Sequence, residues 1–336
     1  MEDSKLMLTS RIKKYLIAVI FTLFLLGSLF INGIASESLE GELIIFHAGS
    51  LTVPVDNIKE AFNKVYPNIE VKTQAGGSRS IAREVAELGK PADILMSADY
   101  VVIDNLLIPD HADWNAVFAV NSMVIMYTDD SRYADEINEN NWYEVLLRDG
   151  VEYGHSEPDM DPCGYRSVLL FQLAENYYGK EGLNQALMDN IPQKNIRPKS
   201  VELIALLETG ALDYAFEYES VALQHQAMDS RFKFVRLPDA INLSSLDYTD
   251  DYAKATIELS GAEPGTTIIT KGEPIVYSLT MPFNGKNHDN AIAFLEFLFD
   301  PDQGLKLLYE SGQPVVEVEA VSGKENIPEE LANLVK

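Results

Sequence analysis

Cysteine and basic side chains are scarce in this chain of 336 residues. Cys163 is the single cysteine, so no disulfide can form within the chain. The five histidines are dispersed, and Cys and His residues do not occur at the spacing of a zinc site. Only 26 Lys and Arg residues oppose 52 Asp and Glu residues, which gives a formal net charge of −26. Nucleic acid is therefore not an expected partner, because phosphate binding needs a basic surface.

Long apolar runs are also missing, except near the N-terminus. Basic residues at 11, 13 and 14 precede a largely apolar segment over 15–34, and small and then acidic residues follow it. This order is typical of a secretory signal. The run approaches the ~20 residues that cross a bilayer, so an uncleaved membrane anchor stays open as the alternative. Residues 1–36 are thus predicted to be a signal peptide or an N-terminal anchor, and the rest of the chain to be exported and membrane-associated.

The chain after residue 36 alternates between strand and helix patterns. Residues 41–46, 69–73 and 92–96 are predicted strands, and residues 52–65 and 80–88 are predicted helices between them. This β-α-β-α-β order is typical of a parallel α/β sheet with right-handed crossovers.

A second α/β unit is predicted after this sheet. Extended residues 117–127 would cross between the two units, and a strand over 275–281 would return to the first. We therefore predict two α/β lobes, with the second inserted into the first. Lobe 1 would comprise residues 37–120 and 275–336, and lobe 2 residues 121–274.

Two turns of small residues follow neighbouring predicted strands and precede helices. They contain Gly49 and Ser50 in one case, and Gly76, Gly77 and Ser78 in the other. The first N–H groups of a helix lack internal partners, so such turns bind anions at the carboxyl edge of a sheet. An ordinary serine cap and an ordinary turn are the alternatives for the two sites.

Acidic residues accompany these turns. Asp161 lies in a turn rich in Pro and Gly that precedes a predicted helix over 167–178, and it could simply cap that helix. Residues 213–218 are a predicted strand that places Glu217 and Glu219 on one face and Tyr218 on the other. A solvent-exposed strand end is the alternative there. Cys163 is interpreted as a buried small side chain rather than a nucleophile.

The chain resembles the archaeal molybdate/tungstate-binding proteins of ABC importers, the ModA/WtpA type. The resemblance covers roughly residues 42–335. The sequence blocks that carry it are His47-Ala48-Gly49-Ser50-Leu51-Thr52-Val53-Pro54, Ala92-Asp93-Ile94-Leu95, Asp161-Pro162-Cys163-Gly164-Tyr165-Arg166-Ser167-Val168, Arg197-Pro198-Lys199, and Ser220-Val221-Ala222 with Gln224-His225.

This resemblance implies a type II periplasmic-binding-protein fold whose two lobes close on an oxyanion, with no cofactor. Its ligand-binding residues would be Gly49, Ser50 and Ser78 from one lobe, and Asp161, Pro162, Cys163, Glu217 and Tyr218 from the other. It further implies delivery of molybdate or tungstate to an ABC permease with its ATPase. The chain is expected to act as a monomer.

Proteins of this type use carboxylates that ligate the metal of the anion directly. Mo(VI) and W(VI) can expand from four to six ligands, whereas sulfur and phosphorus in sulfate and phosphate cannot. Asp161 would be one ligand. Similar proteins have a Glu at the position of Ser200 and an apolar residue at that of Glu217, so we hypothesise that Glu217 supplies the second carboxylate, with Glu202 as a lesser candidate.

Strand alternation argues against Glu217, because Tyr218 should face the site. Three other functions stay open at this point, and one of them is a purely structural surface protein that binds no ligand. A sulfate or phosphate binder would use Asp161 only as a helix cap. An enzyme would use Asp161 and Glu217 as an acid/base pair, although no nucleophile or cofactor motif accompanies them.

Overall fold

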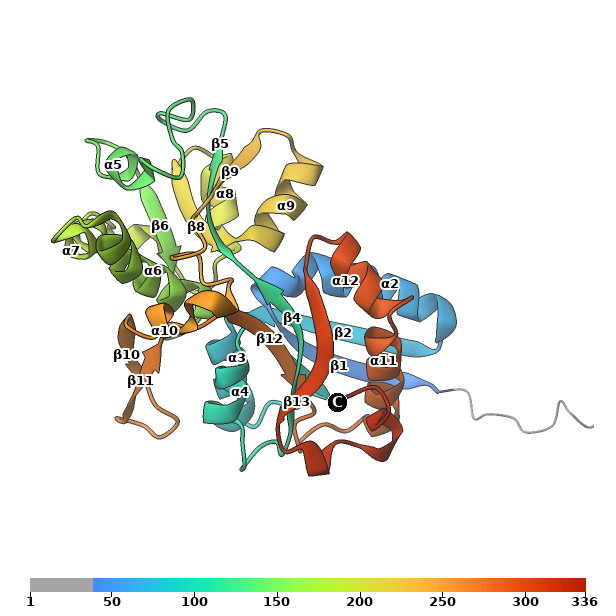
Figure 1. Ribbon diagram of the computed structural model, residues 1–336. Helices are drawn as coiled ribbons and strands as arrows, with labels where there is room; N and C mark the ends of the chain where they lie inside the picture. Colours follow the sequence, from blue (N-terminus) through green and yellow to red (C-terminus); the bar gives the residue numbers. More distant parts are fainter. Residues whose placement is uncertain (1–38) are drawn as a thin grey trace, which may run out of the picture. The chain divides into compact units, whose positions relative to one another are not determined.

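The computed structural model describes residues 39–336, and its first lobe is built on a six-stranded sheet (Figure 1). The strand order is β13-β4-β12-β3-β1-β2. The strands are β1 (Gly41–Ala48), β2 (Ile69–Gly76), β3 (Ile94–Ser97), β4 (Asn115–Asn121), β12 (Ile275–Thr280) and β13 (Val315–Ser322). β1 lies parallel to β2 and β3, so their carboxyl ends meet at one edge, where Ala48 is opposite Gly76.

Helices cover both faces of this sheet, as the alternation of its buried side chains requires. They are α2 (Thr52–Val65), α3 (Ser78–Ala86), α4 (Tyr100–Leu106), α11 (His288–Phe299) and α12 (Gly304–Glu310). Phe46 and Leu95 pack in one core with Ile81 of α3 and Ile103 of α4. In a separate cluster, the Phe62 ring of α2 lies edge-on to Phe294 of α11, with ring centroids 5.2 Å apart.

The second lobe has a five-stranded sheet with the order β7-β6-β8-β5-β9. Its strands are β5 (Met123–Thr128), β6 (Tyr153–Ser156), β7 (Ile196–Arg197), β8 (Tyr214–Tyr218) and β9 (Phe232–Arg236). Its helices are α5 (Trp142–Leu146), α6 (Pro162–Tyr178), α7 (Leu183–Asp189), α8 (Glu202–Glu208), α9 (Glu219–Met228) and α10 (Thr249–Tyr252). A separate hairpin pairs β10 (Thr256–Ser260) with β11 (Thr267–Lys271).

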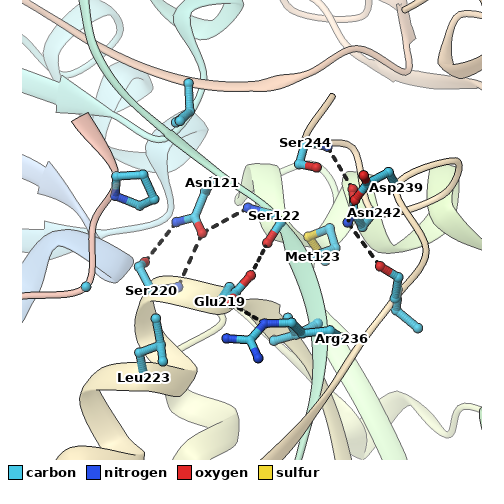
Figure 2. Close-up of a pocket in the computed structure, with 15 residues that line it drawn as sticks. Asn121, Ser122, Met123, Glu219, Ser220, Leu223, Arg236, Asp239, Asn242 and Ser244 are labelled. Atoms are coloured by element: carbon cyan, nitrogen blue, oxygen red, sulfur yellow. Dashed lines mark hydrogen bonds and ion pairs between the residues drawn. The ribbon is translucent and has the colours of Figure 1, made fainter. Parts of the chain in front are cut away.

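The chain crosses between the two sheets at Ser122, which lies between β4 and β5. A cavity of about 310 Å³ lies beside this crossing, and Figure 2 draws the residues that line it. Asn121 donates a hydrogen bond to the Ser220 hydroxyl (2.8 Å), and the Ser122 hydroxyl donates to Glu219 (2.7 Å). The Glu219 carboxylate also pairs with Arg236. The lining of this cavity contains none of the residues that the sequence predicts to bind an anion.

The structure confirms the predicted α/β class and most predicted elements, including the helix over residues 52–65. Helix α6 begins at Pro162 rather than near residue 167, so the predicted turn from Asp161 to Arg166 is the first part of a helix. The physical reason is that Asp161 accepts a cap hydrogen bond and proline suits the first helical position. Glu219 begins α9 and does not share a strand face with Glu217.

The predicted signal peptide or anchor over residues 1–36 lies outside the described residues. Within residues 39–336, no helix combines the length and the apolar character needed to cross a membrane.

Candidate functional site

The first predicted turn lies at the carboxyl end of β1 and is closed over by the second lobe. A Cβ atom added to Gly49 would lie 3.2 Å from a methyl group of Val201. The Ser50 side chain is buried, and its hydroxyl is hydrogen-bonded to that of Tyr277 (2.9 Å). Ser50 does not cap α2, which rules out the capping role considered from sequence.

The second predicted turn approaches the other lobe even more closely. A Cβ on Gly77 would lie 2.3 Å from the carbonyl oxygen of Met160, so only glycine allows this contact. Beyond it, the Ser80 N–H donates to the same carbonyl (3.1 Å). The fully buried Ser78 hydroxyl accepts a hydrogen bond from the Ala98 N–H (2.9 Å).

Asp161 lies directly opposite this turn, and its carboxylate has two backbone partners. One oxygen accepts a hydrogen bond from the Cys163 N–H (3.3 Å), which caps α6, and the other accepts from the Ser200 N–H (2.7 Å). Burial raises the pKa of Asp161, while these hydrogen bonds act in the opposite direction. Asp161 is therefore a helix cap, but one whose second oxygen also fixes the segment around Ser200.

Glu217 is completely buried in β8, close to Asp161. One oxygen accepts a hydrogen bond from the Tyr218 N–H (2.7 Å), and the Cys163 thiol lies 3.8 Å from the same oxygen. Its other oxygen is buried without a hydrogen-bond partner. Burial raises the pKa of Glu217 to about 8, and the negative charge of Asp161 acts in the same direction. An unpartnered buried carboxyl oxygen is costly and marks a place where a ligand would be stabilising.

Tyr218 points to the opposite side of β8, as strand alternation requires. Its hydroxyl accepts a hydrogen bond from Arg166 (2.8 Å), and its ring packs edge-on against Tyr277. The structure therefore brings the Glu217 side chain to Asp161 and Cys163, whereas Tyr218 reaches them through its backbone N–H.

Of the remaining predicted residues, Pro162 and Cys163 are buried near Asp161 and Glu217, whereas Glu202 is only partly buried. Pro162 is buried at the first position of α6, and Cys163 is buried with its thiol 3.6 Å from the Phe216 carbonyl oxygen. Burial raises the pKa of the Cys163 thiol, which agrees with a packing role. Glu202 is partly buried in the first turn of α8, and within residues 39–336 its carboxylate forms no hydrogen bond or ion pair.

A buried ion pair across the two lobes was missed from sequence. The Arg166 guanidinium lies 3.0 Å from the Asp99 carboxylate and donates to the Ala98 carbonyl oxygen (2.7 Å). Tyr165 donates its hydroxyl hydrogen to the same carboxylate. Tyr165 and Arg166 belong to a recognised sequence block, but Asp99 follows β3 without any local signal of its partner.

The candidate site therefore combines two buried carboxyl groups with serine hydroxyls, at a place where the backbones of the two lobes approach each other closely. Among residues 39–336, no cluster of three or more His, Cys, Asp or Glu side chains could hold a free metal cation. The arrangement suits a small ligand that both accepts hydrogen bonds and tolerates carboxylates.

The chain belongs to the family of bacterial extracellular solute-binding proteins, whose family model matches residues 43–308. It is 50% identical to a solute-binding protein of Petrotoga mobilis, over 94% of this chain and 97% of that protein. It is 38% identical to the molybdate/tungstate-binding protein WtpA of Pyrococcus abyssi, over 88% of this chain and 90% of that protein.

Solved structures of periplasmic binding proteins share the two-lobed fold. The molybdate-binding protein of Azotobacter vinelandii aligns with a TM-score of 0.54 at 16% identity, over 81% of this chain and 98% of that one. The sulfate-binding protein SubI of Mycobacterium tuberculosis aligns with a TM-score of 0.58 at 16% identity, over 83% and 88%. These likenesses establish the fold alone.

The raised pKa of Glu217 makes stability depend on pH. Between the ordinary carboxyl pKa and about 8, the folded chain holds a proton that the unfolded chain releases, so this residue lowers stability as pH rises. We expect Glu217→Gln to remove that loss, up to about 1.4 kcal/mol per pH unit. Urea unfolding of ligand-free protein between pH 5 and pH 8 measures it. Glu202→Gln is the control, and an equal pH slope in wild type and Glu217→Gln would contradict the assignment.

Proposed function

We propose that this chain captures molybdate or tungstate between its two lobes and delivers it to an ABC permease with its ATPase. The observation that supports it is the burial of Asp161 and Glu217 together, with one Glu217 oxygen unpartnered. The anion's metal brings four oxygens of its own, so two carboxylate oxygens complete six ligands. The likeness to WtpA proteins supports the same ligand.

In this proposal the remaining contacts come from both lobes. Gly49, Ser50 and Ser78 would offer hydrogen-bond donors from the first lobe. The backbone from Asp161 to Cys163, with Tyr218, would close the site from the second lobe. Sulfate and phosphate would gain no ligands from the two acids, because their central atoms cannot accept additional oxygens, and each carboxyl group that is ionised would repel them.

We further propose that the protein works as a monomer outside the cytoplasmic membrane, held there or exported by residues 1–36. The lobes would be residues 37–120 with 275–336, and residues 121–274, which agrees with the strand content of the two sheets. The chain would bind and release its ligand without chemical change.

Calorimetric titration tests the choice of anion. Residues 37–336 should bind tungstate and molybdate, and sulfate and phosphate should give no heat at the same concentrations, because only the metal centres gain ligands from the two carboxylates. Comparable binding of sulfate would favour a sulfate carrier, in which Asp161 serves only as a cap. If none of the four anions gives a heat of binding, the proposed function is rejected.

Glu217 as the second metal ligand is tested by substitution. Glu217→Gln keeps the size of the side chain and removes the anionic oxygen, so tungstate affinity should fall at least about a hundredfold, or 2.7 kcal/mol. Glu202→Gln serves as the matched control and should keep wild-type affinity. Full affinity in Glu217→Gln together with a loss in Glu202→Gln would transfer the role to Glu202.

Relocating the acid gives a sharper version of this experiment. Ser200 lies beside both carboxyl groups: its N–H donates to Asp161 (2.7 Å), and its hydroxyl, although it forms no hydrogen bond with Glu217, is near enough to lower the pKa of that group. The double variant Ser200→Glu/Glu217→Gln should therefore recover part of the affinity lost in Glu217→Gln. A double variant no better than Glu217→Gln would show that the acid must come from β8.

Gly77 provides a test of lobe closure. Its backbone has φ −63° and ψ 136°, which alanine adopts without strain, so Gly77→Ala should fold as wild type does, with the same far-UV circular dichroism. The added methyl group would meet the Met160 carbonyl only when the lobes close. We expect tungstate affinity to fall about tenfold or more. If calorimetry gives wild-type affinity for Gly77→Ala, the lobes around the bound anion lie farther apart than they do in this structure.

A further inference from the structure

Helix α3 begins at the predicted anion-binding turn, and its two arginines donate hydrogen bonds to the second lobe. Arg79 is 3% exposed, and its guanidinium donates to the carbonyl oxygens of Asp159 (3.1 Å) and Ser260. Arg83, one turn later, donates to the carbonyl oxygens of Ser260 (3.1 Å) and Gly261 (2.7 Å). Both cations of a first-lobe helix therefore bind backbone carbonyls of the segment that contains hairpin β10–β11.

The hairpin is fixed to the second lobe, so these contacts join two bodies that must separate when the site opens. Gln172 of α6 exchanges two hydrogen bonds with the backbone of Thr256, at 2.8 and 3.0 Å. The Ser260 N–H donates to the Asp159 carboxylate (2.7 Å), which ties the end of β10 to the turn before α6. The hairpin thus moves with α6, the helix that Asp161 caps.

Because Arg79 is buried, closure of the two lobes and the hydrogen bonds of Arg79 to the second lobe depend on each other. A guanidinium removed from water without acceptors is unfavourable, and the carbonyls of Asp159 and Ser260 are the acceptors that it meets. Hydrogen bonds from a charged donor are also stronger than those between neutral groups. The Asp159 carboxylate also lies 3.9 Å from the Arg79 guanidinium, so one ion pair across the lobes accompanies the carbonyl contacts.

We propose that hairpin β10–β11 is a closure latch, gripped by Arg79 and Arg83, that sets how long a captured anion stays bound. The carboxylates of Asp161 and Glu217 select the anion, and the latch slows reopening without contacting it. The effect on anion release rests on the proposed function, whereas the effect on the balance between open and closed lobes does not.

Arg83→Gln tests the latch, because Arg83 lies on the helix surface outside the anion site. Radiolabelled tungstate should leave this variant at least about tenfold faster when unlabelled tungstate is added in excess, while the order of anion affinities stays that of wild type. Small-angle X-ray scattering of the ligand-free protein should give a larger radius of gyration for Arg83→Gln than for wild type.

Two matched variants separate the latch from other effects of Arg83. Glu87→Gln removes the ion pair of Arg83 on its own helix (2.5 Å) but leaves the carbonyl contacts, and it should release tungstate at the wild-type rate. Arg148→Gln removes one exposed cation from the second lobe and controls for charge. If Arg83→Gln does not fold, Arg83→Lys replaces it. This variant keeps the positive charge but cannot donate to both carbonyl oxygens as the guanidinium does, so it should release tungstate faster than wild type.

The two measurements distinguish failure of the latch from failure of the proposed function. Release from Arg83→Gln at the wild-type rate, with an unchanged radius of gyration, would overturn the latch. If wild type binds no tungstate, the proposed function fails and the scattering comparison alone decides: a larger radius for Arg83→Gln supports the latch, and equal radii overturn it.

Discussion

Two carboxyl groups are buried beside each other, and the surrounding structure has to compensate the free-energy cost of that burial. Asp161 and Glu217 have left water, and the backbone N–H groups of Cys163, Ser200 and Tyr218 compensate only three of their four oxygens. No cation contacts either carboxylate within residues 39–336, since Arg166 is engaged by Asp99, Ala98 and Tyr218. Such a pair is unfavourable in an empty site and becomes favourable when a ligand completes it.

The fold meets this constraint by building the site from segments far apart in the chain. The acids come from the start of α6 and from β8, while the small-residue turns come from the ends of β1 and β2. At Gly77 the two lobes meet through their backbones, because the Met160 carbonyl occupies the space that a Cβ atom would need. The buried Asp99–Arg166 pair and the arginines of α3 then connect the lobes outside the cluster of Asp161 and Glu217.

The two-lobed architecture is shared with proteins named for different anions, so the fold alone does not identify the ligand. A sulfate-binding and a molybdate-binding protein both have it. The Asp161–Glu217 pair is the feature that would separate them, because its oxygens can ligate a Mo or W centre, whereas the central atoms of sulfate and phosphate accept no additional oxygen ligands.

Sequence by itself determined the α/β class, the parallel β1–β2–β3 arrangement and the helix over residues 52–65, because hydrophobic periodicity and turn residues are local. It also indicated the two small-residue turns and the acid of the 161–166 block. It misplaced the start of α6, because a proline-rich helix start resembles a turn.

Only the tertiary structure decided how the acids meet. Strand alternation correctly put Glu217 and Tyr218 on opposite faces of β8, but it could not say that the N-terminus of α6 and Ser200 pack on the Glu217 face. The partner of Arg166 and the acceptors of Arg79 and Arg83 are likewise remote in sequence, at Asp99 and in hairpin β10–β11. Contacts of that kind depend on how whole elements pack, and no local pattern encodes them.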